Sequence, residues 1–417
     1  MTEKKKILVL ADHPMSPSGV GTQTRYFIEA LLKTEKYKFV CFGGAIEHQD
    51  KRPMKTEEWG EDLIVFPVKG YGDANLIREA LWNERPAAVW IMTDPRFWGW
   101  LWEMEEEIRS HCPLVYYHVW DNYPYPTYNK KFYRSNDAIA SISKVTADIV
   151  QKVSPTTKHR YIPHAVPPAF TIISEDMRKK FREDNFADDE DKFIIFWNNR
   201  NARRKQSGSL IHWFKKFLDK VGHDKAMLLM HTDTKDTHGQ DLDAIIVELG
   251  LTNGEIKFSR QKIPPQHLAL LYNAADVTIN ISDAEGFGLA TLESLSCGTP
   301  IIVSMTGGLQ EQVTDGKKWF GVGIEPASKA IIGSQEIPFI REDRLNEDDV
   351  VNALVTMYEK TDKQRQKLGL LGRKHIEKNY SFEAFEKNWV DFMDEILEEN
   401  GSWDTRKNYK AWEQIQL

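Results

Sequence analysis

Short apolar runs alternate with amphipathic segments over most of the chain. In the first part we predict buried strands at 7–11, 39–42, 63–66, 87–92, 114–119 and 138–142. The segments between them repeat apolar residues with a helical period, which predicts helices at 22–33, 74–84, 99–110 and 144–153. Strands that alternate with helices in this way form a parallel sheet covered on both faces.

A second array of the same kind begins near residue 192. Its predicted strands are 193–197, 226–231, 256–258, 277–281 and 300–304. Its predicted helices are 209–220, 242–249, 265–274 and 289–297, and three more helices follow without strands at 347–360, 363–379 and 382–400. The pattern therefore predicts an α/β protein with two βα domains.

The segment between the two arrays is rich in charge and poor in apolar residues, which predicts a surface helix and a linker. We place a first domain at 1–172, the linker at 173–192, a second domain at 193–378 and a helical tail at 379–417. The end of the tail carries the aromatic residues Trp403, Tyr409 and Trp412. Because such side chains usually pack, we expect the tail to return to the first domain.

Composition adds limits on partners and location. The chain has 417 residues, 41% hydrophobic and 28% charged, which is typical of a soluble globular protein. Its formal net charge of -7 gives no overall field that attracts nucleic acid or an anionic membrane. Three cysteines without paired spacing argue against a disulfide framework, and no apolar run approaches the roughly 20 residues of a membrane span. We expect a cytoplasmic protein without stable membrane association.

The segment 283–293 carries the clearest candidate chemistry. Glu285 stands just before a Gly-x-Gly turn that opens an apolar helix, and Glu293 lies eight residues later inside that helix. Glycines let backbone amides approach a ligand, and amides at a helix start favour an anion such as a diphosphate. A carboxylate accepts hydrogen bonds from both hydroxyls of a cis-diol. The segment therefore suits a nucleotide sugar, although an ordinary turn with two solvated glutamates has the same spacing.

Other segments place this motif in a larger pattern. A basic loop at 197–205 contains Arg200 and Lys205, and the apolar helix ends at a Cys-Gly-Thr-Pro sequence from Cys297 to Pro300. With the segments 271–277 and 306–311, these motifs resemble the donor site of glycosyltransferase family 4, a family of retaining GT-B enzymes. The resemblance implies a GT-B fold, in which two Rossmann-like domains face each other across an interdomain cleft.

The resemblance also implies roles for individual residues. Arg200 and Lys205 match the cations that hold the donor diphosphate, and a leaving nucleoside diphosphate gains negative charge that fixed cations stabilise. Glu285 matches the carboxylate beside the donor sugar, Glu293 matches the ribose partner, and His118 matches a histidine near the reaction centre. The backbone contacts with the donor would come from the glycine loop of the first domain and the turn of the second, at Gly19, Gly21, Gly286, Phe287, Gly288 and Leu289.

We expect no metal and no cofactor besides the nucleotide-sugar donor. The donor loop has no Asp-x-Asp motif, and no His/Cys cluster has ligand spacing. A nicotinamide dehydrogenase is disfavoured because Thr24 stands where a complete Gly-x-Gly-x-x-Gly would need glycine. Retention at the anomeric carbon follows from the resemblance alone.

The acceptor stays open at this stage. An aromatic, proline-containing loop at 120–128 follows His118, and its rings could stack on a sugar or on an extruded base. The acceptor is thus a glycan or small metabolite, or a hydroxylated modified base in DNA. A lipid-linked acceptor is a third option, which is less favoured because the segment 98–110 carries four glutamates where a membrane-docking helix would be basic. Alternatives are another GT-B enzyme, such as a nucleotide-sugar epimerase, and a non-catalytic sugar-nucleotide-binding protein. The oligomeric state is not predicted, and the polar stretch 316–345 is expected to be a surface insertion.

Overall fold

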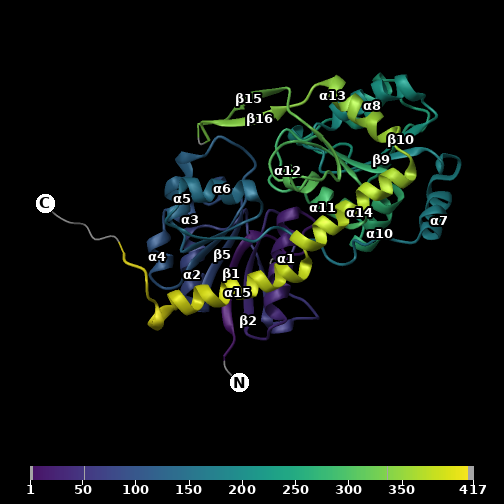
Figure 1. The fold of residues 1–417 in the computed structure, drawn as a ribbon. Coiled ribbons are helices and arrows are strands. Elements are labelled where there is room, and N and C mark those ends of the chain that lie inside the picture. Colours follow the sequence, from purple (N-terminus) through teal and green to yellow (C-terminus); the bar gives the residue numbers. More distant parts are fainter. Residues whose placement is uncertain (1–2, 51, 336, 412–417) are drawn as a thin grey trace. The chain divides into compact units, whose positions relative to one another are not determined.

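The structure is a computed structural model that describes residues 3–50, 52–335 and 337–411 (Figure 1). The chain forms two compact units. Unit 1 comprises Met1–His164, Ser334–Pro338 and Glu383–Leu417, and unit 2 comprises Ala165–Gly333 and Phe339–Phe382. We predict a linker at 173–192 from the sequence, and this range lies within unit 2.

Unit 1 is built, over the described residues, on an eight-stranded sheet with the order β3-β4-β2-β1-β5-β6-β7-β8. Neighbouring strands are parallel except β3 and β4. The strands are β1 (Lys5–Asp12), β2 (Tyr37–Gly44), β3 (Met54–Lys55), β4 (Leu63–Pro67), β5 (Ala88–Thr93), β6 (Leu114–His118), β7 (Ala138–Ser141) and β8 (Lys158–Tyr161). All six strands predicted for this part are present, and β3 and β8 were not predicted.

The helices of unit 1 follow the predicted pattern, except that α5 was not predicted and one predicted helix is divided in two. They are α1 (Gly19–Leu32), α2 (Ala74–Glu84), α3 (Gly99–Trp102), α4 (Glu105–Arg109), α5 (Lys130–Arg134), α6 (Lys144–Val153) and α15 (Phe382–Asn400). The prediction of one helix over 99–110 is wrong, because the chain breaks at Met104 (φ -110°, ψ 22°). Trp102 and Met104 are both buried, and residues two apart cannot share one helix face. The break lets both side chains enter the core.

Helix α15 packs on the sheet of unit 1, as Figure 1 shows where it crosses β1 and β2. Trp389 is fully buried, with its ring 4.8 Å from those of Phe27 and Tyr117. Beyond the helix, Trp403 stacks on His111 with ring centroids 4.6 Å apart. Among the tail aromatics named from the sequence, Trp412 lies outside the described residues.

Unit 2 has a parallel six-stranded sheet over the described residues, with the order β11-β10-β9-β12-β13-β14. Its strands are β9 (Phe193–Asn198), β10 (Ala226–His231), β11 (Ile256–Ser259), β12 (Val277–Asn280), β13 (Ile301–Ser304) and β14 (Gly321–Ile324). The helices are α7 (Glu175–Phe186), α8 (Ser207–Val221), α9 (Leu242–Glu248), α10 (Pro265–Ala274), α11 (Leu289–Ser296), α12 (Leu309–Val313), α13 (Glu347–Tyr358) and α14 (Asp362–Asn379).

The stretch 316–345 differs from the single surface insertion that the sequence predicts. Its first part enters the sheet as edge strand β14, which pairs with β13. A Cβ atom on Gly321 would lie 1.8 Å from the carbonyl oxygen of Ile301, so only glycine fits there. The rest forms an antiparallel hairpin of β15 (Ser328–Ile332) and β16 (Ile340–Arg344).

The strand order reverses near the centre of each sheet. In unit 1, β1 lies between β2 and β5, and in unit 2, β9 lies between β10 and β12. In open parallel sheets, ligands bind at the carboxyl ends of the strands beside such a switch point. In unit 2 this rule selects the loop 199–206 after β9 and the turn 281–288 after β12.

Candidate active site

The loop after β9 directs a lysine toward the turn after β12. A short 3-10 helix spans Arg203–Lys205, and Gln206 adopts a left-handed conformation (φ 57°) before α8 begins. The amide of Asp283 donates to the carbonyl of Arg204 over 2.8 Å, which joins the loop to the turn. Lys205 is buried as a result of this arrangement, with a relative exposure of 8%.

The buried amine of Lys205 forms an ion pair with Glu285. A guanidinium nitrogen of Arg204 lies 3.7 Å from the same carboxylate. Burial alone would raise the pKa of Glu285, but the charges of Lys205 and Arg204 outweigh it and hold that pKa below its ordinary value. The pair therefore presents a fixed cation and a fixed anion beside the glycine turn.

The glycine turn opens α11. Gly288 has φ 95° and ψ 69°, a conformation that favours glycine, and among the described residues no side chain caps the helix start. A Cβ atom on Gly308 would lie 2.6 Å from the Cα of Phe287, so the segment before α12 packs directly against the turn. The amide of Gly308 donates to the carbonyl of Glu285 over 3.0 Å. The first turn of α11 thus has the geometry that favours an anion, and the segment before α12 packs against it.

A buried amide that the sequence reasoning missed orients this turn. The side-chain nitrogen of Gln312 donates to the carbonyls of Phe287 (2.8 Å) and Gly288 (3.2 Å), and its oxygen accepts from the hydroxyl of Thr291 (2.6 Å). Gln312 and Thr291 are both fully buried. The sequence gives no signal for this role, because Gln312 is one of three consecutive polar residues in the short helix Leu309–Val313.

Glu293 lies in a separate polar group on the same helix. It accepts hydrogen bonds from the hydroxyl of Tyr272 (2.6 Å) and from the side-chain amide of Asn198 (3.4 Å). Asn198 is the last residue of β9. Burial raises the pKa of Glu293 to about 7, although both hydrogen bonds act in the opposite direction. The ordinary value is 4.5, so this carboxyl changes charge near neutral pH.

Arg200 is directed to a different partner. Its guanidinium binds Asp236 over 2.6 Å and lies 2.7 Å from a ring nitrogen of His238. Its side chain is 61% exposed. The structure thus brings Lys205 and Glu285 together and leaves Arg200 at the rim, paired with the loop that follows β10.

The glycine loop of unit 1 forms the start of α1. Ser18 caps the helix by accepting from the amide of Gly21 (2.9 Å), and its hydroxyl donates to the buried Asp12 at the end of β1 (2.5 Å). The other oxygen of Asp12 accepts from the hydroxyl of Tyr71 over 2.8 Å. A Cβ atom on Gly21 would lie 2.2 Å from the Ser16 hydroxyl, whereas Gly19 is exposed.

His118 ends β6 and is fully buried. Its Nε2 lies 2.8 Å from the hydroxyl of Tyr133, and its Nδ1 has no hydrogen-bond partner among the described residues. Burial lowers the pKa of His118 to about 3, so the ring is neutral. The aromatic loop after it is anchored as well, because Tyr123 and Tyr125 both donate to Asp148 of α6 (3.1 and 2.8 Å).

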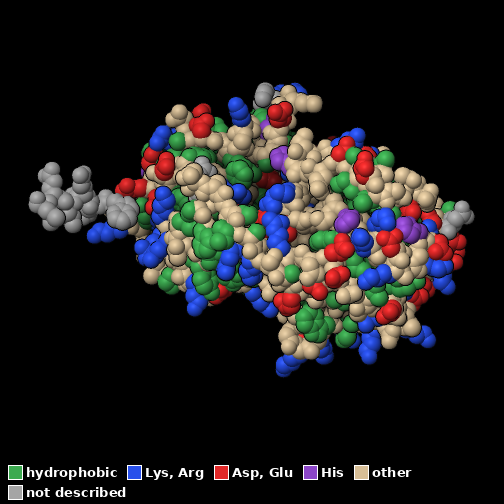
Figure 2. All heavy atoms as spheres, turned by 90° about the horizontal axis from the view of Figure 1, so that it is seen from above, with side chains coloured by type: hydrophobic (Ala, Val, Ile, Leu, Met, Phe, Trp, Pro, Cys, Tyr) green, Lys and Arg blue, Asp and Glu red, His purple; other side chains and the backbone are tan. Residues whose placement is uncertain are grey.

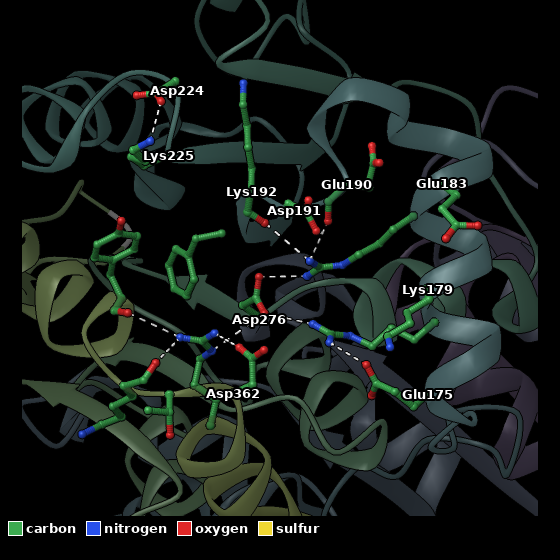
Figure 3. A pocket seen from close by; sticks show the side chains of 17 residues that line it. Glu175, Lys179, Glu183, Glu190, Asp191, Lys192, Asp224, Lys225, Asp276 and Asp362 are labelled. Atoms are coloured by element: carbon green, nitrogen blue, oxygen red, sulfur yellow. Dashed lines mark hydrogen bonds and ion pairs between the residues drawn. The ribbon is translucent and has the colours of Figure 1, made fainter.

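A cavity of about 850 Å³ lies at the opposite end of the unit 2 sheet, where the strands begin (Figure 3). Figure 3 shows Asp276 at its centre. This carboxylate accepts from Arg178 (2.9 Å) and Arg182 (2.8 Å), which attach α7 to the sheet. Because these charges are satisfied by one another, we interpret this cavity as structural.

Among the described residues, no group of three or more His, Cys, Asp or Glu side chains is arranged to hold a metal ion. No helix in the described part of the chain has the length and apolar character needed to cross a bilayer.

Comparison with solved structures identifies the fold class. The sucrose-phosphate synthase from Thermosynechococcus elongatus superposes with a TM-score of 0.74 over 95% of this chain and 100% of that one, at 16% identity. HepE from Anabaena, in complex with UDP and glucose, gives a TM-score of 0.69 over 94% of this chain and 100% of that chain, at 15% identity. The protein has the GT-B fold of these structures.

Sequence comparison adds a match to a family model. Residues 177–334 match the family model Glycosyl transferases group 1. A D-inositol 3-phosphate glycosyltransferase from Acidothermus cellulolyticus is 39% identical over 98 residues, 23% of this chain and 21% of that protein. An uncharacterized glycosyltransferase from Methanocaldococcus jannaschii is 28% identical over 183 residues, 42% of this chain and 43% of that protein. The chain thus spans less than half the length of these curated relatives.

Proposed function

We propose that the protein transfers a sugar from a nucleoside-diphosphate sugar to a hydroxyl acceptor, with retention at the anomeric carbon and without a metal ion. The observation that carries the proposal is the buried Lys205–Glu285 pair beside the start of α11. A diphosphate at that helix start would lie near a buried cation and a row of amides. The matched family model and the names of the relatives support the same function, because both describe glycosyltransferases.

Each residue of the proposed site has a separate task. Lys205 stabilises the charge that develops on the leaving diphosphate, because a fixed cation in a buried site needs no reorganisation. Arg200 adds a second charge at the rim after it exchanges Asp236 for phosphate. Glu285 contacts the donor sugar, and Glu293 accepts from the ribose hydroxyls. His118 is neutral in the structure and is proposed to contact the donor sugar as a hydrogen-bonding group.

We propose a small hydroxylated acceptor, a glycan or a metabolite. The similar proteins include a D-inositol 3-phosphate glycosyltransferase and a sucrose-phosphate synthase, whose names point to small phosphorylated products or acceptors. Basic and acidic side chains are interspersed over the face drawn in Figure 2, and the net charge is -7. Binding of DNA depends on Lys and Arg contacts with phosphates, so this distribution favours the small acceptor. We place the reaction in the cytoplasm, where the three unpaired, buried cysteines would stay reduced.

The proposal is tested by release of nucleoside diphosphate from UDP-, GDP- and ADP-sugars, with and without EDTA, in the presence of pooled sugar phosphates and polyols. We expect one donor to be consumed only when an acceptor is present, at a rate that EDTA does not change. The product's anomeric configuration, read by NMR, tests retention. Glu285→Gln should abolish turnover, whereas Glu248→Gln, on the exposed surface of α9, should not change it.

Two other outcomes would reject transferase activity. Consumption of the donor without any acceptor, giving an epimeric nucleotide sugar, would indicate an epimerase. Tight binding of a nucleotide sugar with no turnover across the acceptor pool would indicate a sugar-nucleotide-binding protein.

A further inference from the structure

The hairpin β15–β16 is bonded to the backbone of the candidate donor site. The amide of Asp343 donates to the carbonyl of Asp283 over 2.9 Å. The amide of Asp283 in turn donates to the carbonyl of Arg204 over 2.8 Å. Three segments that are far apart in sequence therefore form one short ladder: the basic loop, the start of the glycine turn and the second strand of the hairpin.

Four charged side chains reinforce this ladder. Glu342 accepts two hydrogen bonds from Arg203 (2.9 and 2.5 Å) and one from Arg344 (2.7 Å). Arg344 also forms an ion pair with Asp283, and Gln206 donates to the same carboxylate over 2.7 Å. The side chains of Asp283 and Glu342 are only 4% and 3% exposed.

Buried carboxylates of this kind need their partners. Removing one partner of a buried ion pair leaves an uncompensated charge, which is strongly destabilising. Arg344 is the one side chain in this cluster that contacts both carboxylates directly within hydrogen-bonding distance. Without it, Glu342 keeps its hydrogen bonds from Arg203, whereas Asp283 keeps, among the described side chains, only the neutral Gln206 within hydrogen-bonding distance. The direct link between the two carboxylates is then lost, and the segments that carry them can shift.

Such a rearrangement would affect the donor site because the cluster lies next to it in sequence. Asp283 is two residues before Glu285, and Arg203 is two residues before Lys205. The cluster thus fixes both segments that present the buried Lys205–Glu285 pair. Displacement of a binding group by about 1 Å can cost as much as 100-fold in rate.

We propose that the β15–β16 hairpin is a positioning element of the donor site, in which Arg344 and Glu342 hold the basic loop and the glycine turn in register. This inference rests on the proposed function and adds residues that contact no substrate themselves. It gives the hairpin a role on the donor side of the enzyme.

The test is the affinity for UDP, GDP and ADP, measured by calorimetry on the full chain and followed by donor KM and kcat. For the nucleotide that wild type binds best, Arg344→Ala should weaken binding about tenfold and raise the donor KM by a similar factor, with a smaller change in kcat. Arg344→Lys should recover part of the affinity, because a lysine can still pair with one carboxylate. Glu342→Gln should also weaken nucleotide binding. This variant provides the same test if Arg344→Ala does not fold.

The matched control is Lys329→Ala on the same hairpin. Lys329 is 52% exposed and pairs with Asp343 at 2.5 Å, so its loss should leave affinity and KM unchanged. Lower thermal stability of Arg344→Ala and Glu342→Gln with wild-type affinity would overturn the positioning role and leave the proposed function standing. If wild type binds none of the three nucleotides, the proposed function and this inference both fall.

Discussion

The candidate loops of the two units are built from different chemistry. In unit 2, the segments after β9 and β12 carry paired charges, and the pair of Lys205 with Glu285 is buried. In unit 1, the groups around the ends of β1 and β6 are joined by hydroxyls, as where Asp12 accepts from Ser18 and Tyr71. Buried ion pairs suit a site that must exchange one anion for another, such as a diphosphate. A hydroxyl-rich site suits neutral, hydroxylated ligands.

Replacing the buried lysine of unit 2 should have the greatest effect on donor binding and transfer. Lys205→Ala removes the partner of a buried carboxylate and the cation nearest the proposed diphosphate, so UDP affinity and transfer should each fall about 100-fold. Calorimetry and initial rates measure this. Lys215→Ala is the matched control, because Lys215 lies on the surface of α8 and pairs with Asp219 at 3.0 Å. Equal kinetics for wild type and Lys205→Ala would remove this residue from the site.

A change in unit 1 should separate catalysis from donor binding. His118→Gln replaces a neutral, buried ring that bonds to Tyr133, and we expect kcat to fall about tenfold with UDP affinity unchanged. Because burial lowers the pKa of His118 to about 3, the wild-type rate should show no step from this group between pH 5 and 8. An inflection in that range that disappears in His118→Gln would contradict the account.

Loss of the buried amide beneath the glycine turn should have a smaller effect. Gln312→Leu keeps the approximate volume but removes the donors to the carbonyls of Phe287 and Gly288, so the amides of the turn lose their fixed orientation. We expect the donor KM to rise about fivefold with less change in kcat, since uniform binding is lost. Gln310→Leu on the same helix is the control. A higher kcat together with an unchanged KM would argue against an orienting role.

The smallest effect concerns pH. Burial raises the pKa of Glu293 from 4.5 to about 7. The protonated carboxyl therefore stabilises the folded protein fully below pH 4.5, and this contribution is lost as the pH rises through 7. Only the ionised carboxylate accepts from both ribose hydroxyls. From pH 6.5 to 8, the affinity of the wild-type protein for UDP should rise about fourfold relative to that of Glu293→Gln. Over the same range, the thermal stability of the wild-type protein should fall relative to that of the variant. Parallel pH profiles for the two proteins would refute the assignment.

The central elements of both sheets follow from the sequence, because buried parallel strands appear as apolar runs. The edges do not. Strand β8 has the sequence Lys-His-Arg-Tyr, and its lysine pairs with Glu399 of α15 at 2.6 Å, more than 200 residues later in the chain. Strand β14 contains two glycines, which disfavour strands locally, and the close approach of Ile301 requires the one at Gly321.

The candidate site divides in the same way. The glycine turn and the paired charges are local motifs, so Glu285 and Lys205 could be named from spacing and resemblance. The residues that support them come from elsewhere: Gln312 from α12, and Glu342 with Arg344 from the hairpin. Their roles depend on contacts that no periodicity records. The partner of Arg200, Asp236, is likewise set by a loop after a different strand.

A crystal structure of the protein with UDP would show where the nucleotide binds. We expect the diphosphate at the first turn of α11, bonded to the amides of 287–289 and to Lys205, with the ribose at Glu293. A diphosphate bound away from this turn, with Lys205 still paired only to Glu285, would contradict this expectation.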